Sequence, residues 1–182
     1  LRLMLDAHPK LSIPPETHFI PALLQLKGEG DVLRDEFYRT VVSAPTWGDF
    51  HISPDVFHEN LQTIKPFTLA DGLRCFYRLY AQRFNKPRYG DKTPIHNLYM
   101  CAIEDILPEA HFIHMIRDGR DVAISLRKLW FGPGDDIEAQ ASDWLRRIRE
   151  ARQQAELCQH YMEVRYEDLI TDTKNVLKSI CK

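Results

Sequence analysis

Residues 111–126 read His-Phe-Ile-His-Met-Ile-Arg-Asp-Gly-Arg-Asp-Val-Ala-Ile-Ser-Leu, and this stretch decides the fold of the chain. Residues 112–116 form a short apolar run behind a Pro108-Glu109 break, which is typical of a buried strand of a parallel sheet. Arg117-Asp118-Gly119 ends that strand, and Asp118 is a good N-cap for a helix whose apolar residues recur as far as Trp130. The stretch therefore predicts a strand, a tight turn and a helix, with the turn where open α/β sheets bind ligands.

Two polar side chains flank this turn. Arg117 is the first residue after the strand, and Ser125 lies two turns into the helix, about 10 Å along its axis. An arginine laid along the helix can meet the serine hydroxyl around one anion, and a planar guanidinium suits a phosphate better than a lysine does. An arginine in a surface ion pair and a solvated serine fit the same spacing, so the spacing alone leaves both interpretations open.

The pattern Ile-Arg-Asp-Gly-Arg-Asp-Val-Ala-Ile-Ser, residues 116–125, closely resembles the 3′-phosphate-binding segment of sulfotransferases that use 3′-phosphoadenosine-5′-phosphosulfate (PAPS). In that family the arginine and the serine hold the 3′-phosphate, which implies this role for Arg117 and Ser125. Tyr166-Glu167-Asp168-Leu169 resembles another family segment, which implies that Tyr166 contacts the adenine. The resemblance covers nearly the whole chain. It implies PAPS as the sulfuryl donor and 3′-phosphoadenosine-5′-phosphate (PAP) as the product.

Two further polar residues follow short strands nearer the N-terminus. Glu16 comes after a predicted strand at residues 10–13 and a Pro14-Pro15 break, and Lys92 comes after a predicted strand that begins near Arg88. Strand ends of this kind meet at one edge of a parallel sheet, so we expect Glu16 and Lys92 to converge on one cleft. A simpler interpretation has no cleft: Glu16 caps a helix, and Lys92 is a solvated residue of a turn.

The resemblance gives this pair catalytic roles. Cytosolic sulfotransferases use the histidine of a Lys-Thr-His triplet as the base, whereas this chain has Lys92-Thr93-Pro94. Pro-Glu-Thr at residues 15–17 instead resembles tyrosylprotein sulfotransferases and bacterial relatives, in which the glutamate is the general base. This implies Glu16 as the base and Lys92 as the cation that stabilises the leaving oxygen. We expect His18 to face elsewhere, because a helix should begin near Thr17.

The position of the cysteines separates the branches of this family. By our alignment, the cysteines that tyrosylprotein sulfotransferases carry near these motifs fall at Ile13 and Gly90. This favours a bacterial-type relative.

The alternation of strands and helices predicts an α/β fold. The resemblance implies a three-layer parallel sheet of the P-loop NTPase-like sulfotransferase type. Further helices are expected at residues 69–84, 95–106 and 137–158 and from Thr173, with a last strand at residues 161–165 and short helices and loops over residues 28–68.

The first and last residues of the chain bear on how much of the domain we expect it to contain. Leu1 falls within an amphipathic helix, and the last helix stops in the middle of an apolar face at Lys182. We therefore expect residues 1–182 to be a single sulfotransferase-like domain truncated at both ends. It would lack the first strand and the loop that holds the 5′-phosphosulfate, and such a fragment is expected to be inactive by itself.

Composition narrows the class of protein. The formal net charge of −2 gives no reason to expect a nucleic-acid partner, and no run of 18 apolar residues is present. The four cysteines contain no Cys-x-x-Cys pair, which predicts free thiols in a reducing compartment and hence a cytoplasmic protein. His111 and His114 lie at positions of a strand that point to opposite faces, so no metal site is predicted.

The sequence therefore predicts sulfuryl transfer from PAPS to an acceptor hydroxyl or amine by in-line displacement. The acceptor, whether small molecule, carbohydrate or peptide, and the oligomeric state stay open. One alternative is an ATP-dependent P-loop kinase-like enzyme, whose Gly-x-x-x-x-Gly-Lys-[Ser/Thr] motif does not occur in these residues. The other is a non-catalytic binding domain of the same fold.

Overall fold

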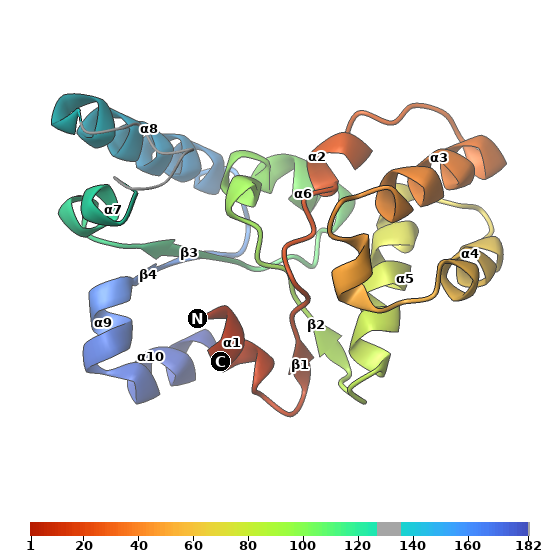
Figure 1. Cartoon of the computed structure of the whole chain (residues 1–182), viewed down its shortest axis with the longest axis horizontal. Coiled ribbons are helices and arrows are strands. Elements are labelled where there is room, and N and C mark those ends of the chain that lie inside the picture. Colours follow the sequence, from red (N-terminus) through yellow and green to blue (C-terminus); the bar gives the residue numbers. More distant parts are fainter. Residues whose placement is uncertain (127–135, 182) are drawn as a thin grey trace. The chain divides into compact units, whose positions relative to one another are not determined.

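The computed structural model describes residues 1–126 and 136–181, and the chain divides into two compact units, Leu1–His96 and Asn97–Lys182 (Figure 1). Both units combine helices with a two-stranded parallel sheet. The predicted α/β class is therefore confirmed, whereas the three-layer sheet stays a prediction. Among the described residues, no helix is both long and apolar enough to cross a bilayer.

The first unit is mainly helical. Its elements in chain order are α1 (Arg2–Asp6), β1 (Leu11–Ser12), α2 (Ile20–Leu23), α3 (Gly30–Val42), the 3-10 helix η1 (Trp47–Phe50), α4 (Pro54–Gln62), α5 (Leu69–Gln82), β2 (Arg88–Tyr89) and the 3-10 helix η2 (Pro94–Leu98), which runs past the unit's end. β1 and β2 pair in parallel, with Leu11 opposite Arg88 and Ser12 opposite Tyr89.

Aromatic side chains from these helices form the core of the first unit. Phe37, Phe50, Phe57 and Phe76 are fully buried, and the Phe76 ring meets the Phe50 ring edge-on with centroids 5.0 Å apart. Edge-on pairs of this kind add about 0.5–1.5 kcal/mol each to the burial of the rings. The packed core holds α5 against β1 and β2. α5 therefore supports the loops that follow these two strands.

The second unit is built on the predicted strand–turn–helix stretch. It contains α6 (Met100–Ile106), β3 (Phe112–Ile116), α7 (Gly119–Leu126), α8 (Ile137–Ala155), β4 (Tyr161–Arg165), α9 (Tyr166–Thr171) and α10 (Thr173–Ile180). β3 and β4 pair in parallel from Phe112 opposite Tyr161 to Ile116 opposite Arg165. In Figure 1, α7 and α8 lie above this strand pair, and α9 and α10 lie below it.

Several predicted elements differ in the structure. The helix expected near Thr17 is only the four-residue α2, which begins at Ile20, because the left-handed φ of 56° at His18 is incompatible with a right-handed helix. The helix expected at residues 95–106 is divided between η2 and α6, because Tyr99 has a non-helical φ of −127°. The expected continuation of α7 to Trp130 and the expected loop at residues 131–134 lie outside the described residues.

Candidate active site

The ends of β1 and β2 bring Glu16 and Lys92 together. Because the strands are parallel, the segments that follow them leave the sheet at the same edge. There the Lys92 Nζ ammonium donates a hydrogen bond to Glu16 Oε1, and the two side chains are 49% and 34% exposed. The predicted contact is present and open to solvent, while the catalytic roles of the two residues stay predictions.

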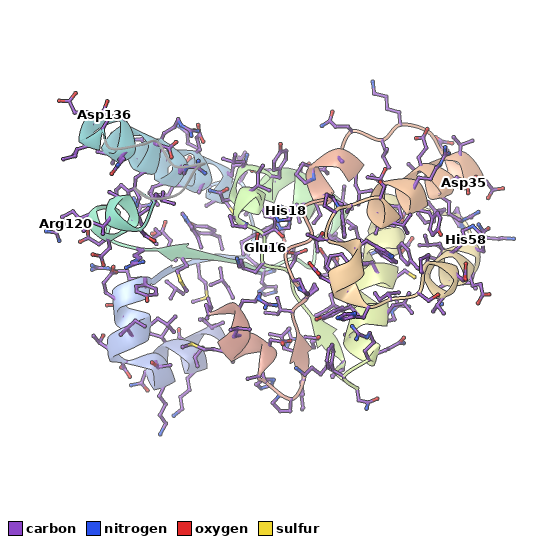
Figure 2. All side chains as sticks on the ribbon, in the orientation of Figure 1. Glu16, His18, Asp35, His58, Arg120 and Asp136 are labelled. Carbon is purple, nitrogen blue, oxygen red and sulfur yellow. The ribbon has the colours of Figure 1, made fainter. Side chains whose placement is uncertain are left out.

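His18 lies beside Glu16, contrary to the sequence-based expectation (Figure 2). The His18 Nε2 atom is 3.1 Å from Glu16 Oε2. The chain does not enter a helix at Thr17 but turns at His18, whose φ of 56° lies in the left-handed region. Histidine adopts this region more often than most non-glycine residues. The Glu16 carboxylate therefore has Lys92 at one oxygen and His18 at the other.

Asp91 connects the two segments that carry Glu16 and Lys92. Its Oδ2 atom accepts hydrogen bonds from the Thr17 hydroxyl at 2.7 Å and from the Tyr77 phenol. Its Oδ1 atom accepts the Thr93 hydroxyl at 2.9 Å, and the Thr93 oxygen accepts the Thr17 backbone N–H at 3.0 Å. We call Thr17, Tyr77, Asp91 and Thr93 the Asp91 cluster.

The Asp91 cluster is largely shielded from solvent, with the Asp91 side chain 12% exposed. Thr17, Tyr77 and Thr93 are all buried. Burial, reinforced by the negative charge of Asp91, raises the pKa of Tyr77 well above its usual value, so the phenol stays a neutral donor. Sequence reasoning missed this cluster, although its signal is visible as an aspartate and a threonine on either side of Lys92.

His96 lies at the edge of the same cluster. Its Nδ1 atom is 3.7 Å from Asp91 Oδ1, and its Nε2 atom is buried without a hydrogen-bond partner. Burial lowers the pKa of His96, so the ring is neutral near pH 7. A neutral imidazole with a free nitrogen can accept a proton, which makes His96 a second candidate base.

In the second unit, Arg117 and Tyr166 form a contact at the ends of β3 and β4. The guanidinium carbon of Arg117 lies 4.8 Å from the centroid of the Tyr166 ring. Arg117 Nη2 is 3.4 Å from Asp121 Oδ2, which is a long and partly exposed ion pair. Arg117 Nε is buried and has no partner. The guanidinium is therefore oriented by an aromatic ring and retains hydrogen-bonding capacity for an anion.

The turn that carries Arg117 is fixed by neighbouring elements. Trp144 of α8 donates its Nε1–H to the Arg117 carbonyl at 3.2 Å. The same indole packs on Gly119, where an added Cβ would lie 3.1 Å from the Trp144 ring, so a larger residue fits poorly here. Glu167 Oε1 accepts the Asp118 backbone N–H at 2.9 Å, and this bond lowers the pKa of Glu167.

Asp118 caps α7 as the sequence predicts. Its Oδ1 atom accepts the Arg120 backbone N–H at 2.9 Å, and its bonds with Arg120 lower the pKa of Asp118 to about 2. Ser125 lies near the end of α7 with an exposed side chain. The structure thus unites Arg117 with Tyr166, and it leaves Ser125 open to solvent on the neighbouring helix.

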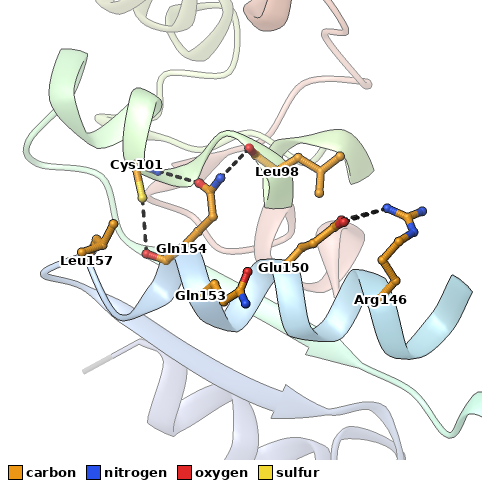
Figure 3. A pocket seen from close by; sticks show the side chains of 7 residues that line it. All are labelled: Leu98, Cys101, Arg146, Glu150, Gln153, Gln154 and Leu157. Atoms are coloured by element: carbon orange, nitrogen blue, oxygen red, sulfur yellow. Dashed lines mark hydrogen bonds and ion pairs between the residues drawn. The ribbon is translucent and has the colours of Figure 1, made fainter. Parts of the chain in front are cut away.

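One pocket of the second unit is lined by none of these side chains. It has a volume of about 510 Å³ and lies between α8 and the segment that begins α6 (Figure 3). Its lining consists of Leu98, Cys101, Arg146, Glu150, Gln153, Gln154 and Leu157. The polar groups there bond to one another, since Arg146 pairs with Glu150 and the Gln154 amide binds Cys101 and Leu98. We therefore place the chemistry at the strand ends.

The structure describes the side chains of residues 1–126 and 136–181. No cluster of three or more histidine, cysteine, aspartate or glutamate side chains there could hold a metal ion. Cys75, Cys101, Cys158 and Cys181 are free thiols.

Comparison with known proteins gives a consistent result. A model of the sulfotransferase family matches residues 1–182. The chain is 27% identical over 137 residues to omega-hydroxy-beta-dihydromenaquinone-9 sulfotransferase Stf3 of Mycobacterium bovis and of Mycobacterium tuberculosis, which covers 66% of this chain and 35% of each relative. The chain therefore spans about a third of the length of the curated relatives it matches.

A solved structure shares the fold. The sulfotransferase domain of the olefin synthase from Synechococcus PCC 7002 superposes with a TM-score of 0.59 at 22% sequence identity. The match covers 100% of this chain and 66% of that domain.

Proposed function

Since this chain belongs to the sulfotransferase family, we propose that its protein transfers a sulfuryl group from PAPS to an acceptor hydroxyl or amine. We assign the donor's 3′-phosphate to Arg117 and Ser125 and its adenine to Tyr166. Glu16 is assigned as the general base and Lys92 as the cation at the leaving oxygen. The bacterial-type branch and the three-layer sheet belong to the same proposal.

The state of Arg117 is the observation that carries the donor assignment. Its Nε–H is buried without a partner, its ion pair with Asp121 is long at 3.4 Å, and Tyr166 lies beneath its plane. A buried donor without a partner is costly, and a phosphate oxygen can satisfy it through a charge-assisted bond. The residues at this turn therefore fit a phosphate ester beside a flat aromatic group.

The Glu16–Lys92 pair suits the chemistry of the transfer. PAPS supplies the sulfuryl group when bound, and the acceptor must lose a proton as its oxygen or nitrogen attacks. Each Glu16 oxygen has two acceptor sites, so the carboxylate can take the acceptor's proton although Lys92 and His18 already contact it. The fixed charge of Lys92 is available to stabilise negative charge on the departing oxygen.

Thermal unfolding of the full-length protein with added nucleotides tests the donor assignment. A ligand at 100 times its Kd stabilises the folded state by about 2.7 kcal/mol, so PAP should raise the unfolding midpoint. ADP should have little effect, because it lacks the 3′-phosphate. Stabilisation by ADP and ATP but not by PAP would favour the kinase-like alternative and contradict our proposal.

A further inference from the structure

We propose that Asp91 is a positioning residue that holds the Glu16 segment against the Lys92 segment, so that the two side chains meet. The catalytic consequence of this inference rests on the proposed function. Asp91 itself makes no ion pair with Lys92 in the structure, and it contacts neither donor nor acceptor in our assignment. It acts through the residues next to the catalytic pair.

Every hydroxyl group of the Asp91 cluster donates a hydrogen bond to the Asp91 carboxylate. The Thr93 oxygen accepts the Thr17 N–H, so the Thr93 hydroxyl proton is directed to Asp91 Oδ1. The Thr17 hydroxyl and the Tyr77 phenol donate to Oδ2. Three hydroxyl donors therefore converge on one carboxylate that is only 12% exposed. All three donors are satisfied in this geometry only if both side-chain oxygens of residue 91 accept hydrogen bonds. This explains why the residue is an aspartate, since an asparagine of the same size has an NH2 group in place of one oxygen.

The cluster is adjacent in sequence to both catalytic candidates. Thr17 directly follows Glu16, and Asp91 and Thr93 lie on either side of Lys92. The side chains of Glu16 and Lys92 are partly exposed, so their own packing cannot fix their separation. Tyr77 belongs to α5 and so connects the cluster to the aromatic core. The centroids of the Tyr77 and Phe76 rings are 5.2 Å apart. The buried cluster therefore sets the geometry of the exposed pair.

The reactivity of the Lys92 amine gives a test that needs no catalysis. A lysine held in an ion pair by a carboxylate acylates slowly, and a loosened lysine acylates faster. In the full-length protein, peptide mass spectrometry after limited acylation should show a several-fold faster reaction at Lys92 in Asp91→Asn than in the wild type. The exposed Lys27 should react at the same rate in both proteins and serves as the internal reference.

Turnover gives the second readout. Asp91→Asn should lower kcat on the order of 10²-fold, because a displacement of about 1 Å at reacting groups has this effect, while the KM for PAPS stays unchanged. In a Glu16→Gln background the same substitution should have little further effect, since Asp91 acts through that residue. Leu61→Ala, a core substitution in α4, is the matched control, because it destabilises the unit without touching the cluster.

Thr93→Val provides a second variant of similar shape should Asp91→Asn fold poorly, because it removes one donor to Asp91 and one acceptor for Thr17. Unchanged Lys92 acylation in both variants would overturn the inference, as would equal effects in Leu61→Ala. If Lys92 acylates faster in these variants but the wild-type protein transfers no sulfuryl group, the positioning role of Asp91 is supported. That result would contradict only the proposed function.

Discussion

Arg117 illustrates how a single residue is prepared for a ligand. Its backbone carbonyl is held by Trp144, and the face of its guanidinium lies over Tyr166, so little conformational freedom remains in the side chain. Its neighbour Arg120 belongs to the same turn but is 89% exposed and paired with Asp118. The two arginines therefore provide a test residue and a matched control.

Arg117→Ala should weaken PAP binding to the full-length protein by about 1.5–3 kcal/mol, the usual worth of a hydrogen bond to a charged group. Isothermal titration measures this loss directly. Adenosine-5′-phosphosulfate, which lacks the 3′-phosphate, should bind equally well to wild type and variant, and Arg120→Ala should bind PAP normally. Equal losses for both ligands would mean that Arg117 only supports the fold.

Glu16→Gln should lower kcat by about 10²–10⁴-fold, because it removes the group that accepts the proton, and should leave PAP affinity intact. Steady-state kinetics with an identified acceptor measure this. His18 and His96 are the competing bases, since one contacts Glu16 and the other has a free buried nitrogen. If Glu16→Gln remains active while His96→Ala or His18→Ala is inactive, the base is a histidine.

Lys92→Ala should lower kcat on the order of 10²–10³-fold with little change in PAP affinity, because its charge is needed mainly as the leaving oxygen becomes negative. Parallel measurements of kcat and of PAP binding separate the two effects. Lys86, which pairs with Asp6, gives a matched lysine control. Normal turnover by Lys92→Ala would make Lys92 an ordinary turn residue.

The residues missed from the sequence share a physical cause. His18 was expected to face away from Glu16, but its left-handed backbone follows from Thr17 being held by Asp91 and Thr93, which are distant in sequence. Such long-range bonds leave no local pattern. Arg117 and Tyr166 could be selected from the sequence because each follows a strand directly, and Glu16 and Lys92 because each lies within four residues of a strand end.

At the scale of elements, β4 is attached to α8 by an ion pair. Arg152 donates two hydrogen bonds to Glu163 at 2.8 and 2.9 Å. Glu163 also accepts the Tyr161 hydroxyl at 2.9 Å, and that hydroxyl lies 2.7 Å from His114 Nδ1 on β3. The bonds from Arg152 lower the pKa of Glu163 from 4.5 to about 2.

This shift predicts a pH dependence of stability. A carboxylate with a lowered pKa stabilises the folded state above its unfolded pKa, and the contribution disappears as the pH falls through the folded value. Glu163→Gln should therefore lower the urea midpoint at pH 7, and its difference from the wild type should shrink between pH 4.5 and about 2. Glu156→Gln on the exposed end of α8 should show no such trend. A difference that is constant with pH would contradict the role of this pair.

The elements themselves were predictable to different degrees. β3 and the start of α7 were predictable because a short, mostly apolar run and a capping aspartate are local signals, and β4 because Met162 and Val164 alternate with polar residues. The break between η2 and α6 was missed, because the apolar period of residues 95–106 continues across it. α8 ends at Ala155, before the expected Cys158, and Leu145 is 43% exposed although its spacing predicts burial.

At the scale of the whole molecule, the family assignment depends on the entire chain, while each site depends on one unit. The family model spans all 182 residues, and the fold match covers the whole chain. Glu16 and Lys92 belong to the first unit, and Arg117, Ser125 and Tyr166 belong to the second. Sequence resemblance identified the family, and the roles of these residues stay predictions, whereas the acceptor has no local signature in the sequence.

Transfer of labelled sulfuryl groups from PAPS by the full-length protein tests the central claim most directly. The protein should be incubated with [35S]PAPS and a panel of phenols, alcohols and amines, with Arg117→Ala and Glu16→Gln as paired variants. We predict a labelled product and free PAP with the wild type, loss of transfer at low PAPS with Arg117→Ala, and loss at every PAPS concentration with Glu16→Gln. Binding of PAPS without transfer to any acceptor, or transfer unaffected by both substitutions, would contradict the account.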